Sequence, residues 1–119
     1  MKHFEDELHK QIAQYLFYTI KGDKDFWTYM PFGEKRNIIT GALLKAKGTK
    51  KGVPDFMILN RKGKNTIIIW LEVKFGKNKQ SLEQIDFENK TKSMKNEFYF
   101  TVYSLEEVKN IIEDYYNMK

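Results

Sequence analysis

The stretch PDFMILNRKGKNTIIIWLEVKF, residues 54–75, decides how the fold of this 119-residue chain is predicted. It holds two strand-like runs, residues 55–59 and 66–75, which are rich in β-branched and other apolar residues. Between them, residues 60–65 have the composition of a hairpin turn, with Gly63 in the middle. We therefore expect the two runs to pair as a β-hairpin.

Further elements are expected on both sides of the hairpin. Apolar residues recur at helical spacing over residues 4–17, 36–46 and 105–115, whereas residues 26–32 and 97–103 are strand-like. Ser81 with Gln84, and Ser104 with Glu107, have the spacing of capping boxes, which places one helix over residues 81–92 and begins the last one. The order α-β-α-β-β-α-β-α predicts a single α/β or α+β domain, residues 1–119, with one central sheet flanked by helices.

The composition excludes several kinds of site. No cysteine is present, so disulfides, a zinc ribbon and a cysteine nucleophile are ruled out. The two histidines, His3 and His9, leave any metal site to be built largely from carboxylate oxygens, which favours Mg²⁺, Mn²⁺ or Ca²⁺ over zinc. The longest apolar run, residues 66–71, has the length of a strand, and the first residues are charged. We therefore expect a cytoplasmic protein without a membrane span.

Three charged residues stand out in the apolar hairpin: Asp55 at its start, and Glu72 and Lys74 near its end. Side chains alternate along a strand, so Glu72 and Lys74 share one face. Asp55 lies eight residues before Gly63 and Glu72 nine after it, which predicts that they meet across the hairpin. An E-x-K sequence alone is also typical of a solvated strand edge or a surface ion pair, so this grouping depends on the hairpin.

Two carboxylates and an ammonium in this arrangement suit phosphodiester hydrolysis. Asp55 and Glu72, helped by the carbonyl of Val73, can hold a hard divalent cation in a shell of oxygens. Such a cation makes a bound water more acidic and stabilises charge on a phosphate. Lys74 can orient or help deprotonate the attacking water, or neutralise charge in the transition state.

A set of ordered motifs extends this pattern along the chain. Lys51-Gly52-Val53-Pro54-Asp55-Phe56 is followed by Leu71-Glu72-Val73-Lys74 and then by Ser81-Leu82-Glu83-Gln84, with Lys35-Arg36 and residues 43–48 upstream. Together they resemble the VRR-NUC family, the virus-type replication and repair nucleases of the PD-(D/E)XK superfamily. The similarity covers nearly the whole chain. It implies a restriction-endonuclease-like core with a mixed sheet, and an endodeoxyribonuclease that requires Mg²⁺ or Mn²⁺.

The resemblance also implies a role for each residue that matches a motif. Asp55, Glu72 and the Val73 carbonyl would ligate the metal, and Lys74 would be the catalytic lysine. Gln84 would match the family's glutamine on the following helix. Gln84 has an alternative reading, in which it is only the capping-box partner of Ser81.

The family also has a glutamate on its first helix. We align it with Glu5, counted as a catalytic residue, and keep Glu7 as the alternative. Glu5 can equally be a solvated glutamate favoured by the helix dipole. His9 stands where the family often has glutamine, a departure that is compatible with a supporting role, a local hydrogen bond or no role.

The basic residues near these motifs are candidates for DNA binding. The net charge of +5 is compatible with a polyanionic partner. Arg36 could clamp a phosphate through two hydrogen bonds, or form a structural salt bridge. Lysines flanking the proposed site could grip the DNA backbone independently of sequence, although scattered lysines are also usual on a solvated surface. These lysines are Lys45, Lys47, Lys50, Lys51, Lys77 and Lys79.

The resemblance further implies the substrate and the assembly. Stand-alone members of the family resemble Holliday-junction resolvases in size, so we expect a homodimer that cuts branched DNA such as four-way junctions. The virus-type relatives imply a phage or prophage gene acting in the cytoplasm of a bacterial host. Two alternatives stay open: a catalytically silent DNA-binding module of the same fold, and a phage accessory protein that acts through protein contacts.

Overall fold

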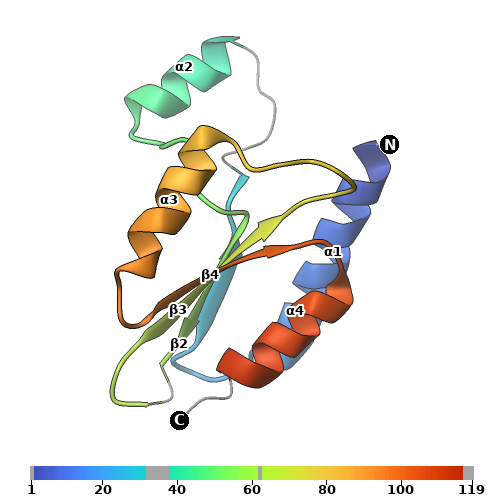
Figure 1. Cartoon of the computed structure of the whole chain (residues 1–119), viewed down its shortest axis with the longest axis vertical. Helices are drawn as coiled ribbons and strands as arrows, with labels where there is room; N and C mark the ends of the chain where they lie inside the picture. The colour runs from blue at the N-terminus through green and yellow to red at the C-terminus, as the bar shows by residue number, and fades with distance from the viewer. Residues whose placement is uncertain (1, 32–37, 62, 117–119) are drawn as a thin grey trace.

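A computed structural model describes residues 2–31, 38–61 and 63–116 of the chain. A central four-stranded sheet carries helices on both faces (Figure 1). The order of helices and strands in the described ranges is the expected α-β-α-β-β-α-β-α. The prediction of an α/β domain with one flanked mixed sheet is confirmed at this level.

The expected hairpin forms the middle of the sheet. Strands β2 (Phe56–Asn60) and β3 (Ile67–Val73) pair antiparallel, with Phe56 opposite Leu71 and Asn60 opposite Ile67. The register is centred on the turn, as the composition of residues 60–65 predicts.

Two outer strands complete the sheet in the order β1-β2-β3-β4. Strand β1 (Phe26–Tyr29) pairs antiparallel with β2, and β4 (Glu97–Val102) pairs parallel with β3. A parallel pair needs a crossover connection, which here contains helix α3 (Leu82–Lys92). β1 ends earlier than the predicted 26–32 strand, just before Pro31, whose missing N–H cannot serve a sheet ladder.

The helices are divided between the two faces of the sheet (Figure 1). Helix α1 (Lys2–Thr19) and helix α4 (Leu105–Ile111), which continues as the π-helix η2 (Ile112–Tyr116), lie together on one face. Helix α3 covers the other face, and α2 (Ile38–Ala46) lies beyond it at one end of the molecule. The predicted 36–46 helix begins two residues before α2; residues 36 and 37 lie outside the described ranges.

The apolar core lies between the sheet and the helices α1 and α4. Alternate β3 residues point into it, and Ile69, Leu71 and Val73 are buried. Helix α1 contributes buried side chains at helical spacing, as the sequence predicts. The remaining buried apolar residues come from β2, β4 and the C-terminal helix, and the full set is Leu8, Ile12, Leu16, Ile20, Phe56, Ile58, Ile69, Leu71, Val73, Val102, Val108, Ile112 and Tyr116.

Both predicted helix starts are capped, but in different ways. Ser81 and Gln84 form a complete capping box, in which each side chain binds the other residue's backbone N–H. At α4 the Ser104 hydroxyl accepts the N–H of Glu107, as expected, but the Glu107 carboxylate accepts the N–H of Tyr103 instead of that of Ser104. None of the helices in the described ranges is long and apolar enough to cross a membrane.

Candidate active site

The hairpin register brings Asp55 and Glu72 together. Since Phe56 pairs with Leu71, the residue just before β2, Asp55, falls opposite Glu72. The Asp55 carboxylate accepts the backbone N–H of Val73 at 2.7 Å, and its carbonyl oxygen accepts the N–H of Met30 at 2.6 Å. Asp55 is therefore fixed from both neighbouring strands.

Glu72 is a buried carboxylate in an unusual environment. Only 3% of the residue is exposed. Its Oε2 atom accepts a hydrogen bond from Gln84 Nε2 at 3.1 Å and lies 3.5 Å from Lys74 Nζ. Its Oε1 atom is buried without a hydrogen-bond partner in the described part of the chain. A buried polar atom left in this way is costly unless something else, such as a cation, binds it.

The electrostatics of Glu72 follow from this environment. Burial, together with the negative charge of neighbouring Asp55, raises the pKa of Glu72 to about 8, although the positive charge of Lys74 lowers it. Two adjacent carboxylates repel each other, and one ammonium offsets only one of the two charges. The Asp55–Glu72 pair is therefore a site that favours an additional positive charge.

Gln84 is the capping-box partner of Ser81 and also forms hydrogen bonds with Lys74 and Glu72. Its Oε1 atom accepts hydrogen bonds from the Ser81 N–H at 2.8 Å and from Lys74 Nζ at 2.9 Å, while Nε2 donates to Glu72. The capping box thus fixes the amide whose two ends hold Lys74 and Glu72. The start of α3 is in this way tied to the end of β3.

His9, on α1, reaches the same cluster from the opposite side of the sheet. Its Nε2 atom lies 3.8 Å from Asp55 Oδ2 and has no hydrogen-bond partner among the described residues. Burial lowers the pKa of His9, but the negative charges of Asp55, Glu5 and Asp6 outweigh this effect and raise the pKa overall. In the sequence His9 lies next to Leu8, a residue of the apolar pattern of the first helix, but this pattern does not indicate that His9 lies close to Asp55.

The two candidates for the first-helix acid differ in position. Glu5 is half-buried, and its charge contributes to the raised pKa of His9. Glu7 is exposed and pairs with Lys10 at 3.7 Å. Of these two glutamates, Glu5 is the one whose charge affects the pKa of His9.

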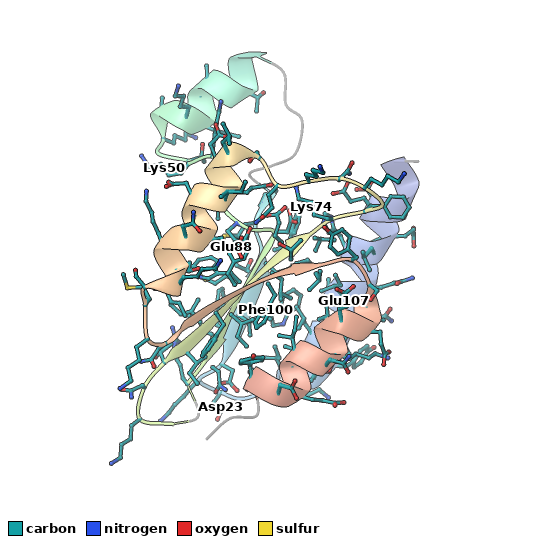
Figure 2. The ribbon with its side chains drawn as sticks, viewed as in Figure 1. Asp23, Lys50, Lys74, Glu88, Phe100 and Glu107 are labelled. Atoms are coloured by element: carbon teal, nitrogen blue, oxygen red, sulfur yellow. The ribbon has the colours of Figure 1, made fainter. Side chains whose placement is uncertain are left out.

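Gln80 forms two side-chain hydrogen bonds that the sequence motifs did not indicate. Its amide donates to the Tyr99 hydroxyl at 3.1 Å and to the Glu88 carboxylate at 3.0 Å. These bonds connect the loop before α3 to α3 itself and to β4; Glu88 is labelled on α3 in Figure 2. No motif marks Gln80, because its partners become neighbours only after the crossover has folded.

A hard divalent cation fits these residues. In the described ranges, no three His, Cys, Asp or Glu side chains gather as a ready-made ligand set, so Asp55 and Glu72 need a further donor. The N–H of Val73 points at Asp55, and in a strand the N–H and C=O of one residue face the same neighbour. The Val73 carbonyl is therefore turned toward the Asp55 side. Two carboxylates and a carbonyl form the oxygen environment that Mg²⁺ and Mn²⁺ prefer.

Gly52 holds the basic loop close to this site. It has φ +85°, and a Cβ atom added there would stand 2.5 Å from the carbonyl oxygen of Glu83, in the first turn of α3. Glycine alone permits both this backbone conformation and this close approach. The loop after α2 therefore packs against the helix that carries Gln84.

The candidate DNA-binding lysines are all exposed. They lie at the end of α2 and after it, and between β3 and α3, and are Lys45, Lys47, Lys50, Lys51, Lys77 and Lys79. Figure 2 shows Lys50 in the same half of the molecule as Lys74, near α2 and α3. Arg36 lies outside the described residues.

Comparison with known proteins gave no match. No protein-family model fits this sequence, and no curated protein and no solved structure is significantly similar to the chain.

Proposed function

We propose that this protein is a metal-dependent DNA endonuclease that hydrolyses phosphodiester bonds with Mg²⁺ or Mn²⁺. The observation that carries the proposal is the pairing of Asp55 with Glu72, whose buried Oε1 atom lacks a hydrogen-bond partner in the described ranges. Charged groups buried next to one another are destabilising unless a counter-ion offsets them. Lys74 supplies only one positive charge, so the second carboxylate takes up either a proton, as the raised pKa of Glu72 indicates, or a divalent cation.

Each residue of the cluster has a task in this reaction. Asp55, Glu72 and the Val73 carbonyl would hold the cation, which when bound makes water more acidic and stabilises negative charge on a phosphate. The Lys74 ammonium can donate a hydrogen bond that orients the attacking water, or neutralise charge that develops on a phosphate oxygen. Gln84 holds Lys74 through its amide oxygen, so that the ammonium is positioned by a neutral partner.

The proposal includes membership of the VRR-NUC family, with its PD-(D/E)XK core, on the basis of the sequence motifs. Motifs that are distant in sequence supply Asp55, Glu72, Lys74 and Gln84. Gln84 is hydrogen-bonded to Lys74 and to Glu72, and Lys74 forms an ion pair with Glu72. Action on branched DNA, as a homodimer, is the part of the proposal that rests on the resemblance alone. Two symmetric cuts would require two sites related by a two-fold axis, which a homodimer provides.

Cleavage of a labelled set of DNAs tests this function. Linear duplex, single strand, flap and four-way junction are incubated with Mg²⁺, Mn²⁺ or a chelator. We expect metal-dependent cutting that Asp55→Ala and Lys74→Ala abolish and that Lys90→Ala, which breaks an exposed ion pair with Asp86, leaves unchanged.

The results separate the alternatives. Selective cutting of the junction supports the resolvase-like dimer, whereas equal cutting of all forms keeps the nuclease and removes the junction preference. Salt-sensitive DNA binding without cleavage would identify a silent binding module. Absence of DNA binding would favour a protein that acts through protein contacts.

A further inference from the structure

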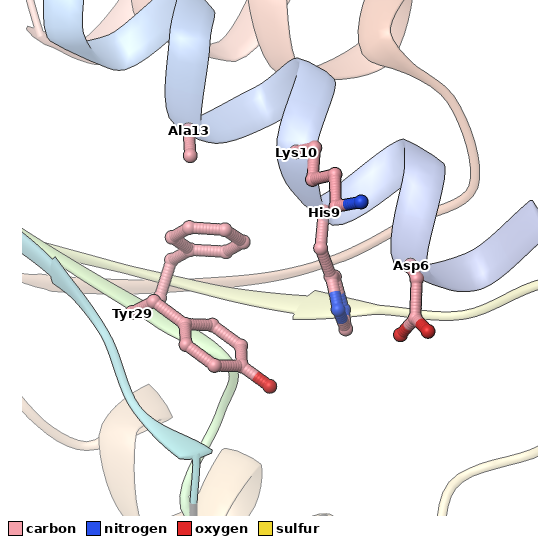
Figure 3. A pocket seen from close by; sticks show the side chains of 6 residues that line it. Asp6, His9, Lys10, Ala13 and Tyr29 are labelled. Carbon is pink, nitrogen blue, oxygen red and sulfur yellow. The ribbon is translucent and has the colours of Figure 1, made fainter. Parts of the chain in front are cut away.

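A cavity of about 390 Å³ opens between α1 and the strands β1 and β2. It is lined by Asp6, His9, Lys10, Ala13, Tyr29 and Phe56. Figure 3 shows the α1 side chains on one side and Tyr29 facing them from β1. His9 lines the cavity and also stands 3.8 Å from Asp55, so the cavity directly adjoins the candidate active site.

Aromatic rings form the inner part of this cavity. The ring centroids of His9 and Tyr29 are 5.4 Å apart, and those of Tyr29 and Phe56 are 5.5 Å apart. Phe56 is fully buried and forms the floor, while Tyr29 and His9 are partly exposed. Protein interiors are normally close-packed, and an open space of this size with aromatic walls is typical of a binding site.

Two charged side chains stand at the rim. Asp6 and Lys10 are both exposed and follow one another by one turn of α1. A carboxylate can accept hydrogen bonds from amino or imino groups, and an ammonium can donate to carbonyl or ring-nitrogen acceptors. An aromatic slot with one acceptor and one donor at its edge matches a nucleobase, which combines a flat π face with a polar edge.

We propose that this cavity receives one unpaired nucleobase of the DNA strand that is cut at the Asp55–Glu72 site. This inference rests on the proposed nuclease function and specifies its substrate. Because His9 belongs to both sites, the nucleotide whose base enters the cavity has its phosphate beside the two carboxylates. A base paired within a duplex cannot enter without leaving the stack, so strands with an unpaired or easily unstacked base at the cut are preferred.

An abasic scan tests the inference by binding rather than by cleavage. A single-stranded oligonucleotide is made in a series, each member lacking one base at a different position. Affinity is measured in the non-cleaving Glu72→Gln background. We expect affinity to fall about tenfold at one position of the scan, since stacking of one base on an aromatic side chain contributes about that much.

Two variants assign the effect to the cavity. Tyr29→Leu keeps an apolar side chain at the wall but removes the ring, so it should weaken binding of the intact strand about tenfold and abolish the position-specific abasic effect. Tyr29→Phe keeps the ring and should bind like the parent, which also tests whether position 29 tolerates substitution. Tyr18→Leu is the matched control, because Tyr18 is a tyrosine of helix α1 that is 62% exposed and does not line the cavity.

Different results would contradict the base-binding cavity and the nuclease function. Equal affinity for every abasic strand, together with metal-dependent cleavage by the parent protein, would overturn the base-binding cavity and leave the nuclease. An abasic effect that persists unchanged in Tyr29→Leu would place base recognition elsewhere and also overturn it. Failure of the protein to bind DNA at all would overturn both proposals.

Discussion

The carboxylate of Glu72, in β3, and the ammonium of Lys74, just after β3, stand 3.5 Å apart, and the side-chain amide of Gln84 binds both. Asp55 adds a second carboxylate from the neighbouring strand. The cluster thus contains two acids and one base, and an atom of the more deeply buried acid has no hydrogen-bond partner in the described ranges. This imbalance of charge leads to predictions about the protein without metal as well as about its activity.

The metal-free protein should lose stability as the pH rises. Burial and the charge of Asp55 together raise the pKa of Glu72 from 4.5 to about 8 in the folded state. Folding therefore favours the protonated carboxyl, so the contribution of Glu72 is fully present below pH 4.5 and is lost as the pH rises through about 8. The loss should be on the order of a few kcal/mol. Urea denaturation with a chelator, repeated across this pH range, measures it.

Bound metal and the substitution Glu72→Gln should each reduce this loss of stability at high pH. Mg²⁺ or Mn²⁺ binds the ionised carboxylates, so it should stabilise the protein more at the alkaline end of the range than at the acid end. Glu72→Gln has no proton to lose and should flatten the pH dependence, while it abolishes cleavage. A metal-free parent protein as stable at high pH as at low pH would contradict the electrostatic account of the site.

The register of the hairpin shows what the sequence could predict. Asp55 and Glu72 are spaced almost symmetrically about Gly63, and antiparallel pairing turns that spacing into proximity. The Ser81–Gln84 capping box is likewise a local pattern, and it is confirmed. Such predictions succeed because strand alternation and turn chemistry act over a few residues.

Contacts between distant elements could not be predicted in the same way. The spacing of Leu8 and Ile12 identifies the buried face of α1, but it does not determine how the helix is placed along the sheet. That placement decides that His9 meets Asp55. The bonds of Gln80 to Tyr99 and Glu88 depend in the same way on the packing of α3 after its crossover.

Mutation can separate the roles of Gln84 and Ser81, although the two residues share one capping box. Ser81→Ala removes only the cap and should cost about 1 kcal/mol of stability, with cleavage changed no more than a few-fold. Gln84→Ala also releases Lys74 and Glu72, and should lower cleavage by about 10- to 100-fold, as is usual for residues that orient metal ligands. Urea denaturation and single-turnover cleavage measured on both variants make the comparison. Equal losses of activity would reduce Gln84 to a capping residue.

Gly52 should tolerate substitution much less than Gly48. Both have positive φ, +85° and +105°, so alanine introduces backbone strain at each. A Cβ atom at Gly52 also meets the Glu83 backbone at 2.5 Å, whereas no atom in the described part of the chain lies within 4 Å of a Cβ added at Gly48. Gly48→Ala should therefore cost about 1–2 kcal/mol of stability and leave cleavage nearly unchanged. Gly52→Ala should cost more and also reduce cleavage, because the clash pushes the basic loop away from α3.

The lysines beside the site should account for the salt dependence of DNA binding. Lys50 and Lys51 are exposed in the loop that packs on α3, whereas Lys90 and Lys92 lie near the end of α3 and pair with acidic residues of the same helix. Replacing either pair by glutamine removes the same charge from the protein. If Lys50 and Lys51 contact phosphates, their loss should reduce the slope of log affinity against log salt by about 0.7 per contact on single strands and about 0.9 on duplex. Loss of Lys90 and Lys92 should leave the slope unchanged, and an equal reduction for both pairs would show that binding responds only to net charge.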